Sequence, residues 1–364
     1  MFDLANLLCT LFGVALTVLF GVAIVRRTVR PTSTAAAYRE VARILGLRMN
    51  TRGTSLAGHK EGRRIWMGEV LQWEGPRKRH ELRGVVDLRR PLGLGLILRS
   101  RSRPRAVFHR YRAAPASLGV TDLDREFDAR AVRVDRLTAL LTPEVIEALR
   151  HLQDHSSDIM ITDLWVQVSP RRAATRPKTV LDLLDAMEAL ANALESARTH
   201  VPVPQELAPL LPSWRELADQ YELDLLDWLP ALEGQLDGHP VLAACIRDRS
   251  RYRVDLRLHF ARHREYGLKL EPQIGRDTSF ASVGQDIQVD DDAFDDRFVV
   301  KGWDAALIRE LLTSDVRASL LDLSMHGGVH IDDDVLELRN LPLESAQLAA
   351  ALDTTRRVVR QLGW

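Results

Sequence analysis

The pattern of apolar and polar positions along the chain occurs twice. In the clearer occurrence, residues 294–300 (FDDRFVV) predict a strand, and residues 311–323 predict an amphipathic helix after a short loop. In the other, residues 127–134 (FDARAVRV) predict the strand and residues 143–152 the helix. A predicted hairpin through an acidic turn follows each occurrence, at 159–168 and 329–338, and then a closing helix with a narrow apolar stripe. This order predicts an α+β fold, in which helices flank an antiparallel sheet on one face.

The two occurrences also begin alike. Residues 38–42 (YREVA) match residues 214–218 (WRELA), and residues 56–59 (LAGH) match residues 236–239 (LDGH), so we interpret His59 and His239 as turn residues. Matches that keep their order along the chain indicate an internal duplication. We predict one copy of the domain at 36–198, a stiff proline-rich linker at 199–212 and a second copy at 213–364.

An almost wholly apolar stretch, Leu4 to Val25, precedes the two copies and predicts one transmembrane helix. Arg26, Arg27 and Arg30 follow within a basic linker at 26–35, so the positive-inside rule predicts a bacterial inner-membrane, single-pass protein whose C-terminal domains lie in the cytoplasm. Small residues spaced four apart in this stretch also allow a homodimer through the span. An uncleaved export anchor would instead place the domains in the periplasm.

A formal net charge of zero conceals a difference between the two parts of the chain. Residues 1–200 carry a net charge of +11, and residues 201–364 carry −11. The densest basic stretch, residues 77–112, holds 12 Lys and Arg against two acidic residues. These residues form the predicted basic binding surface: Arg77, Lys78, Arg79, Arg83, Arg89, Arg90, Arg99, Arg101, Arg103, Arg105, Arg110 and Arg112.

Three interpretations of this basic stretch stay open at this point. It can rest on anionic lipid of the inner leaflet, contact nucleic acid phosphates, or be a loop that is solvated or docked on the acidic second copy. A nearby membrane span would make the lipid contact geometrically easy, and nucleic acid is the less favoured partner. An unknown protein partner is the further expectation.

Residues that could carry chemistry are sparse. His151 and His155 have the helical spacing of metal ligands, but a solvated helix end is the preferred interpretation. The runs 290–292 and 332–334 are acidic but lack the ligand spacing of a calcium loop, so we interpret them as solvated turns. Cys9 and Cys245 are interpreted as buried apolar residues. We expect no catalytic residue, cofactor or metal, because no phosphate-binding, nucleophile or CxxC motif is present.

The central pattern resembles an uncharacterised bacterial membrane-associated domain family, which combines a Phe-x-x-x-Phe-x-Val strand with a Leu-Thr-Pro helix start and a final hairpin. Phe294, Phe298 and Val300 fit the strand, and residues 141–143 (LTP) fit the helix start. The first copy departs at Ala131, where the second Phe is expected, and the second copy departs at Ser314, where Pro is expected. The resemblance implies a membrane-associated protein and supplies no catalytic residues.

We therefore expect a membrane-anchored binding or scaffold protein that is not an enzyme. The alternative is binding of anionic lipid or nucleic acid through residues 77–112. A third option is a hydrolase with a site between the copies, for which no residue in the sequence provides support.

Overall fold

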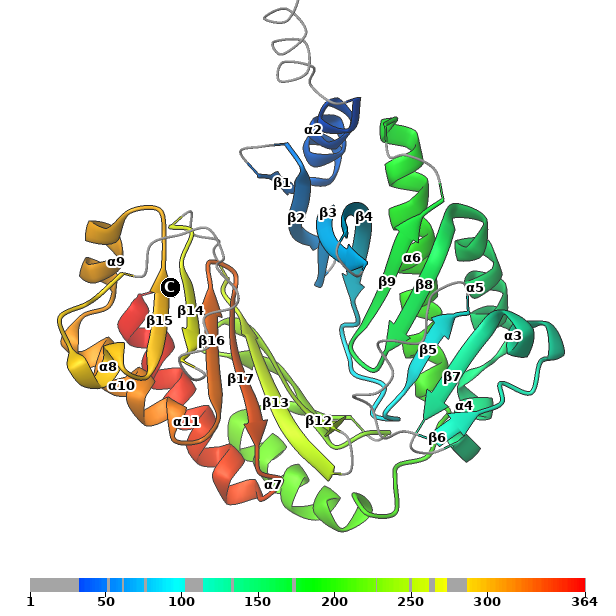
Figure 1. Cartoon of the computed structure of the whole chain (residues 1–364). Coiled ribbons are helices and arrows are strands. Elements are labelled where there is room, and N and C mark those ends of the chain that lie inside the picture. The colour runs from blue at the N-terminus through cyan, green and yellow to red at the C-terminus, as the bar shows by residue number, and fades with distance from the viewer. Residues whose placement is uncertain are drawn as a thin grey trace, which may run out of the picture. The chain divides into compact units, whose positions relative to one another are not determined.

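The structure is a computed structural model that describes residues 33–50, 53–60, 62–74, 77–101, 114–131, 134–171, 175–226, 228–248, 251–261, 266–273 and 287–363. Figure 1 shows two antiparallel sheets with helices packed along them. The α+β class and the antiparallel sheets predicted from the sequence are thus confirmed.

The first sheet has nine strands in the described part of the chain. In spatial order they are β1 (Arg48–Met49), β2 (Ser55–Lys60), β3 (Arg63–Glu74), β4 (Arg77–Asp87), β9 (Trp165–Pro170), β8 (Ser156–Thr162), β5 (Ile97–Ser100), β7 (Phe127–Ala131) and β6 (Ala114–Ala116). The associated helices are α2 (Ser33–Leu45), α3 (Thr121–Glu126), α4 (Val134–Leu140), α5 (Pro143–His155) and α6 (Pro177–Arg198).

The second sheet repeats this order with eight described strands. They are β10 (Asp224–Leu225), β11 (Ala231–Leu236), β12 (His239–Asp248), β13 (Arg251–His259), β17 (Val335–Leu341), β16 (Gly328–Asp332), β14 (Lys269–Pro272) and β15 (Phe298–Lys301). The helices are the 3-10 helix η2 (Ala208–Leu210), then α7 (Leu211–Tyr221), α8 (Asp292–Asp295), α9 (Ala305–Leu311), α10 (Ser314–Ser324) and α11 (Ser345–Leu362). Each strand from β10 to β17 therefore has a counterpart at the same place in the first sheet.

The ends of helices α2 and α7 show that this correspondence extends to local geometry. Helix α2 is followed by Gly46 and helix α7 by Glu222, and both residues have a left-handed backbone, with φ of 65° and 56°. The next amide bonds back to the helix in both cases, at 3.0 Å for Leu47 to Ala42 O and 2.9 Å for Leu223 to Ala218 O. Identical turns at matching places are what a duplicated sequence produces.

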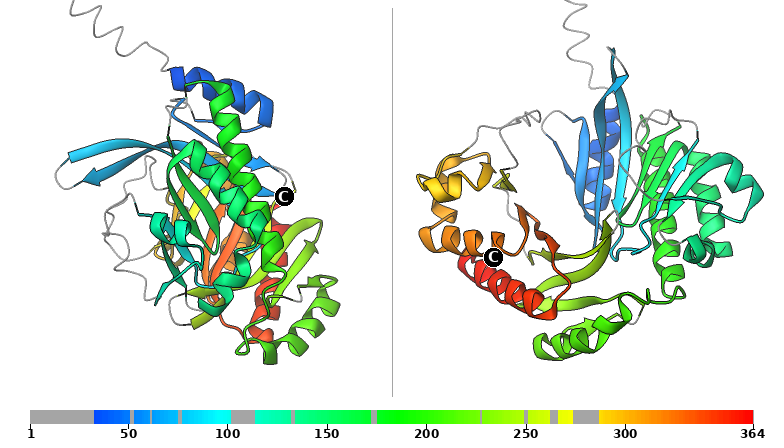
Figure 2. Two further views of the ribbon diagram at one scale, coloured as in Figure 1. Left: turned by 90° about the vertical axis from the view of Figure 1, so that its right-hand side faces the viewer. Right: turned by 60° about the horizontal axis from the view of Figure 1, so that its bottom comes forward.

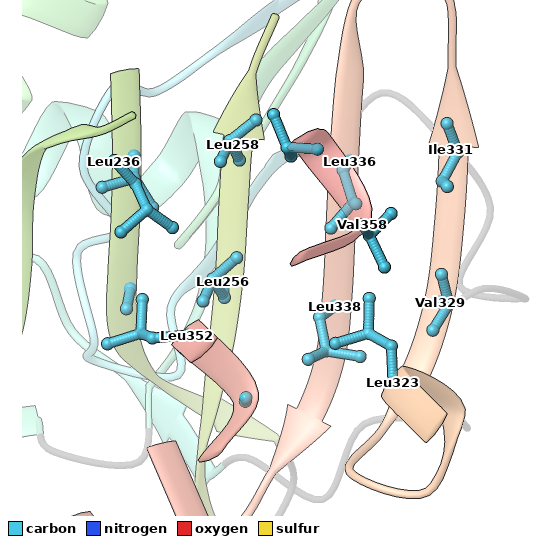
Figure 3. Close-up of a cluster of buried hydrophobic side chains, with 14 of the residues drawn as sticks. Leu236, Leu256, Leu258, Leu323, Val329, Ile331, Leu336, Leu338, Leu352 and Val358 are labelled. Atoms are coloured by element: carbon cyan, nitrogen blue, oxygen red, sulfur yellow. The ribbon is translucent and has the colours of Figure 1, made fainter. Parts of the chain in front are cut away.

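The core of the second sheet lies between its strands and helices α7, α10 and α11. Figure 3 shows Leu256 and Leu258 of β13 beside Leu336 and Leu338 of β17, facing Val358 of α11. Alternate residues of β13 are buried because the strand period of two places Val254, Leu256 and Leu258 on one face. This face holds the sheet against the apolar stripe of α11, as the sequence pattern predicted.

The chain forms two compact units. One unit comprises the described residues up to Asp87 with Ala148–Ile159 and Val166–Ala191. The other comprises Leu88–Glu147, Met160–Trp165 and the described residues from Asn192 onward. The domain boundaries predicted from the sequence remain predictions. Within the proposed linker at 199–212, the chain already forms η2 and begins α7 at Leu211.

The predicted transmembrane helix is contradicted. Among the residues that the structure describes, no helix has the length and apolar character needed to cross a membrane. The longest of them, α6, has 22 residues, but Asp182, Asp185 and Glu188 interrupt its apolar positions. The predicted span, 4–25, lies outside the described residues, and the last residues of the predicted basic linker already belong to α2. Membrane, transmembrane and single-pass assignments are thus unsupported, and the inner-membrane location stays a prediction.

The predicted strand at 294–300 is partly wrong. Residues 292–295 form helix α8, and strand β15 begins only at Phe298. Phe298 therefore corresponds to Phe127, since each is the first residue of its strand. The alignment inferred from the sequence paired Phe127 with Phe294 and was wrong by four residues. Phe294 and Phe298 lie one helical turn apart in sequence, and both are buried, with ring centroids 4.9 Å apart. Both side chains fill the core, which is why the sequence pattern alone mistook one for the other.

Candidate functional site

The structure describes only part of the predicted basic surface. Arg77, Lys78 and Arg79 lie on β4, where the backbone pairing with β3 is described but the side chains are not. Four further members lie outside the described residues: Arg103, Arg105, Arg110 and Arg112. The structure therefore describes the side chains of Arg83, Arg89, Arg90, Arg99 and Arg101.

Arg83 is half-buried on β4. Its guanidinium pairs with the Glu81 carboxylate at 3.3 Å, and Ser169 Oγ donates to the other oxygen of that carboxylate at 2.6 Å. Burial lowers the pKa of Arg83, while the charge of Asp158 opposes that shift. Arg83 is thus part of a local ion pair on the sheet.

Two of the other four arginines, Arg90 and Arg101, make side-chain contacts within the molecule. Arg90 Nε pairs with Glu233 at 2.7 Å, and Arg101 Nε donates to the backbone oxygen of Phe127 at 3.0 Å. Arg99 is only 4% exposed, and the backbone amide of Arg89 donates to Glu195. Where side chains are described, the basic stretch therefore supplies internal contacts as well as surface charge, which sequence counting could not distinguish.

Strands β3 and β4 continue past their neighbours as a two-stranded ribbon. Strand β2 pairs with β3 only as far as Gly68, whereas β3 and β4 stay paired from Glu69↔Leu82 to Glu74↔Arg77. On the other side of β4, strand β9 ends at Pro170. We call residues 69–74 and 77–82 the β3–β4 arm; Figure 2 shows it in blue and cyan, projecting from its sheet in the left-hand view.

The second sheet has an ion-pair network on β13 and β17. The Glu337 side chain is 8% exposed and pairs with Arg257 at 3.2 Å, and Arg339 Nε donates to its second oxygen at 2.9 Å. Asp255 accepts the Asn340 amide at 3.0 Å. Burial raises the pKa of Asp255, and the Asn340 amide and the nearby arginines oppose that shift. These charges satisfy one another, so this surface needs no ligand to be stable.

A buried aspartate occupies the same place in both hairpins. Asp163 accepts the backbone N–H groups of Leu94, Gly95 and Leu96 at 3.2, 2.7 and 3.0 Å. Asp333 accepts those of Gly267 and Leu268 at 2.8 and 3.0 Å. Burial raises the pKa of Asp163, while the three amide donors lower it.

We expected a solvated turn at 332–334, but Asp333 is only 6% exposed, and Asp163 in the other hairpin is 7% exposed; both anchor the chain that enters β5 and β14. The available signal was the repetition itself. Each copy has an Asp in the hairpin turn and a Gly-Leu pair shortly before strand β5 or β14.

His59 and His239 do not occupy equivalent turns. His59 lies within β2, whereas His239 is the first residue of β12, and His239 Nδ1 accepts the Ala261 amide at 2.9 Å. The structural counterpart of Gly58 is Gly234: an added Cβ would approach a leucine side chain at 2.8 Å (Leu47) in one copy and 2.9 Å (Leu223) in the other. The match of LAGH with LDGH was therefore displaced by four residues.

No metal centre is formed by the residues described. Within those ranges, no group of three or more His, Cys, Asp or Glu side chains could hold an ion. His151 and His155 stack edge to face with centroids 5.0 Å apart. In the acidic run at 290–292, Asp291 caps α8 and pairs with Arg317 at 2.9 Å. Cys245 is a free, buried thiol whose pKa is raised by burial, and Cys9 lies outside the described residues.

Comparisons with known proteins identify no family. No family model matches the chain, and no curated protein matches it. Among solved structures, the crystal structure of the mycobacterial trehalose monomycolate transport factor A, TtfA, aligns with 48% of this chain and 99% of its own length. The identity is 11% and the TM-score 0.32, a level of similarity that establishes neither fold nor function.

Proposed function

We propose that this chain is a binding protein and that the β3–β4 arm holds an acidic segment of a partner protein. The observation that carries the proposal is the length of the arm. Strand β3 continues six residues past its last pair with β2, from Glu69 to Glu74, whereas β12 continues four residues past its last pair with β11. The first copy has thus extended a hairpin that both copies possess.

An extended ribbon offers backbone groups to a partner. The Glu69 amide still donates to Thr54 O at 3.2 Å, but beyond Glu69 the described residues of β3 pair only with β4 in the sheet, so the outer edge of the arm carries N–H and C=O groups suited to adding a strand. Main-chain hydrogen bonds of this kind give affinity, and side chains along the edge give specificity.

The charges along β4 indicate the nature of the partner. Lys78, Arg79 and His80 pair across the ribbon with Trp73, Gln72 and Leu71, so no acidic residue lies opposite them. Only Arg77 lies opposite an acid, Glu74. Basic residues with no acid opposite them in the register favour an acidic segment and increase its rate of association.

The test is site-specific photocrosslinking in the full chain. A photoreactive residue at Gln72 is expected to capture a discrete protein, and Lys78→Glu with Arg79→Glu should remove that product. The matched control is Arg251→Glu, an exposed residue on the shorter β12–β13 hairpin, which should leave it unchanged.

Two outcomes contradict the proposal. A crosslinked product that survives the double reversal shows that the basic residues do not select the partner. Binding of the full chain to anionic vesicles, lost on the same reversal and accompanied by no protein crosslink, shows instead that the arm recognises lipid.

A further inference from the structure

A cluster of buried hydrogen-bond donors lies in the second unit, where the end of α6 meets the β12–β13 hairpin. Arg198, the last residue of α6, is 0% exposed. Its Nε donates to Leu92 O and its Nη1 donates to Val201 O at 2.7 Å. Its Nη2 is buried and has no hydrogen-bond partner in the part of the chain that the structure describes. One face of a buried guanidinium is therefore unsatisfied, which is costly unless an acceptor is present.

Arg198 retains its charge in this environment. Burial lowers the pKa of Arg198 to about 10, with Asp163 opposing the shift and Arg136 adding to it, so the group stays protonated at neutral pH. The guanidinium lies 5.0 Å from the centroid of the Trp228 ring. The nearby Asp163 carboxylate is already occupied by three backbone amides, so it leaves the second face of Arg198 unsatisfied.

Two further donors of the cluster come from the hairpin. Arg247 and Tyr252 are cross-strand partners, and the Arg247 guanidinium lies 4.6 Å from the centroid of the Tyr252 ring. Arg247 Nε and the Tyr252 hydroxyl are buried atoms that also have no hydrogen-bond partner among the described residues. The hairpin lies beside Arg198 because Leu92, which accepts the Arg198 Nε bond, precedes Gly93, and a Cβ added at Gly93 would lie 3.8 Å from the backbone oxygen of Cys245 on β12, two residues before Arg247.

Arg136 makes the surroundings more positive without competing for an acceptor. Its Nη1 and Nη2 donate to the backbone oxygens of Pro202 and Val203 at 2.8 and 3.1 Å. Two arginines, Arg136 and Arg198, therefore bond to one stretch of chain, 201–203, and Asp163 is the described acid that acts on the pKa of Arg198. Water could accept hydrogen bonds here, but water brings no charge to offset these arginines.

We propose that Arg198, Arg247 and Tyr252 form a binding site for a small oxyanion of the phosphate or sulfate class. Guanidinium groups bind such oxygens through paired N–H donors, and a tyrosine hydroxyl supplies one more. The bound anion would join the end of α6 to the β12–β13 hairpin. Tyr252 and Arg247 are only partly buried as residues, so the cluster borders solvent on its hairpin side.

The experiment measures phosphate binding to the full chain by calorimetry, with chloride at equal ionic strength as the reference. The wild-type chain should bind phosphate, and Tyr252→Phe should weaken that binding about tenfold, the loss expected for one hydrogen bond to a charged group. Arg247→Gln should weaken it further. Direct calorimetry is needed because phosphate and sulfate also stabilise proteins by exclusion from their surfaces.

Tyr221→Phe is the matched control. Tyr221 lies under Arg356 in a similar stack, 5.4 Å from guanidinium to ring centroid, but its hydroxyl proton is already shared between two acceptors, Ala349 O at 3.1 Å and Asp353 Oδ1 at 2.9 Å. This change should lower stability and leave phosphate affinity unaltered. The proposal is overturned if the wild-type chain binds no phosphate, if Tyr252→Phe has unchanged affinity, or if the control weakens binding equally.

Discussion

The first and second sheets differ most clearly at one matched pair of positions. Arg257 and Glu337 form an ion pair in the second sheet, and the positions that correspond by strand order and register in the first sheet are Val85 and Gln167. The residues on either side remain buried and apolar in both, such as Val166 and Val168 beside Gln167. The same backbone therefore tolerates either solution, because the buried face and not the ion pair holds each sheet to its helices.

The largest effect is expected at the first residue of β7 and β15. Phe127 and Phe298 are both 1% exposed, so Phe127→Ala and Phe298→Ala should each lower the free energy of unfolding by about 3–5 kcal/mol. Urea unfolding of the full chain measures both losses. Trp303→Ala is the control, because this aromatic side chain is 76% exposed and its removal should cost little. A small loss at only one phenylalanine would show that the two positions are not equivalent.

A smaller loss of unfolding free energy is expected when either buried aspartate is removed, and the loss should differ between Asp163 and Asp333. Asp163→Ala removes the acceptor of three backbone amides and should cost roughly 3 kcal/mol, whereas the loss of the Gly267 and Leu268 amide bonds in Asp333→Ala should cost roughly 2 kcal/mol. Hydrogen exchange at the Leu96 and Leu268 amides reports the loss locally. Asp163→Asn keeps an acceptor and should recover part of it. A greater cost at Asp333 would contradict the comparison.

The Arg257–Glu337 ion pair can be replaced by the residue types that the first sheet has at Val85 and Gln167. Glu337→Gln alone leaves Arg257 without its partner and should cost about 1–2 kcal/mol, since the Glu337 side chain is 8% exposed. Adding Arg257→Val reproduces the first sheet and should reduce the loss to below about 1 kcal/mol. Thermal unfolding of both variants decides the point. A double variant less stable than the single one would show that the pair is needed for the second sheet to fold.

The helix ends offer a gain in stability. Glu222 has a φ of 56°, a left-handed conformation in which the first copy has Gly46. Glu222→Gly should raise the free energy of unfolding by about 0.5–1 kcal/mol, because glycine adopts this backbone without steric cost. Gly46→Ala is the reciprocal test, since an added Cβ there has open space and any loss reflects the backbone alone. Equal stability of wild type and Glu222→Gly would count against the matched geometry.

The smallest effect concerns pH. Burial and the charge of Arg339 lower the pKa of His330 below its ordinary 6.5. The unfolded chain therefore takes up this proton more readily than the folded chain, and stability is lost as pH falls through about 6.5. Met160 occupies the matching position on β8, so His330→Met should reduce the loss between about pH 7 and about pH 5. Urea midpoints at the two pH values measure it, and an identical pH dependence would remove His330 as the cause.

The sequence predicted the order of elements well where apolar spacing is decisive. Both hairpins and both closing helices were predicted from period-two and helical spacing. The prediction was wrong where one residue spacing is compatible with two structures. Phe294 and Phe298 are four residues apart, and this interval fits an alternating strand. In the structure Phe294 instead belongs to helix α8, and strand β15 begins at Phe298. The prediction for His59 was also wrong. The Gly-His pair shared by the two copies suggested a turn, whereas His59 pairs with Arg64 of β3 inside the sheet.

The sequence by itself determined that one order of apolar positions occurs twice, since strand alternation and helical period are properties of the local chain. Only the tertiary structure decided which charged side chains are buried and which groups they contact. Asp163 meets amides at 94–96, and Arg198 meets Leu92, because folding brings distant segments together. Burial of apolar side chains is non-directional and leaves a readable pattern, whereas a buried charge depends on the exact position of partners that sequence spacing does not contain.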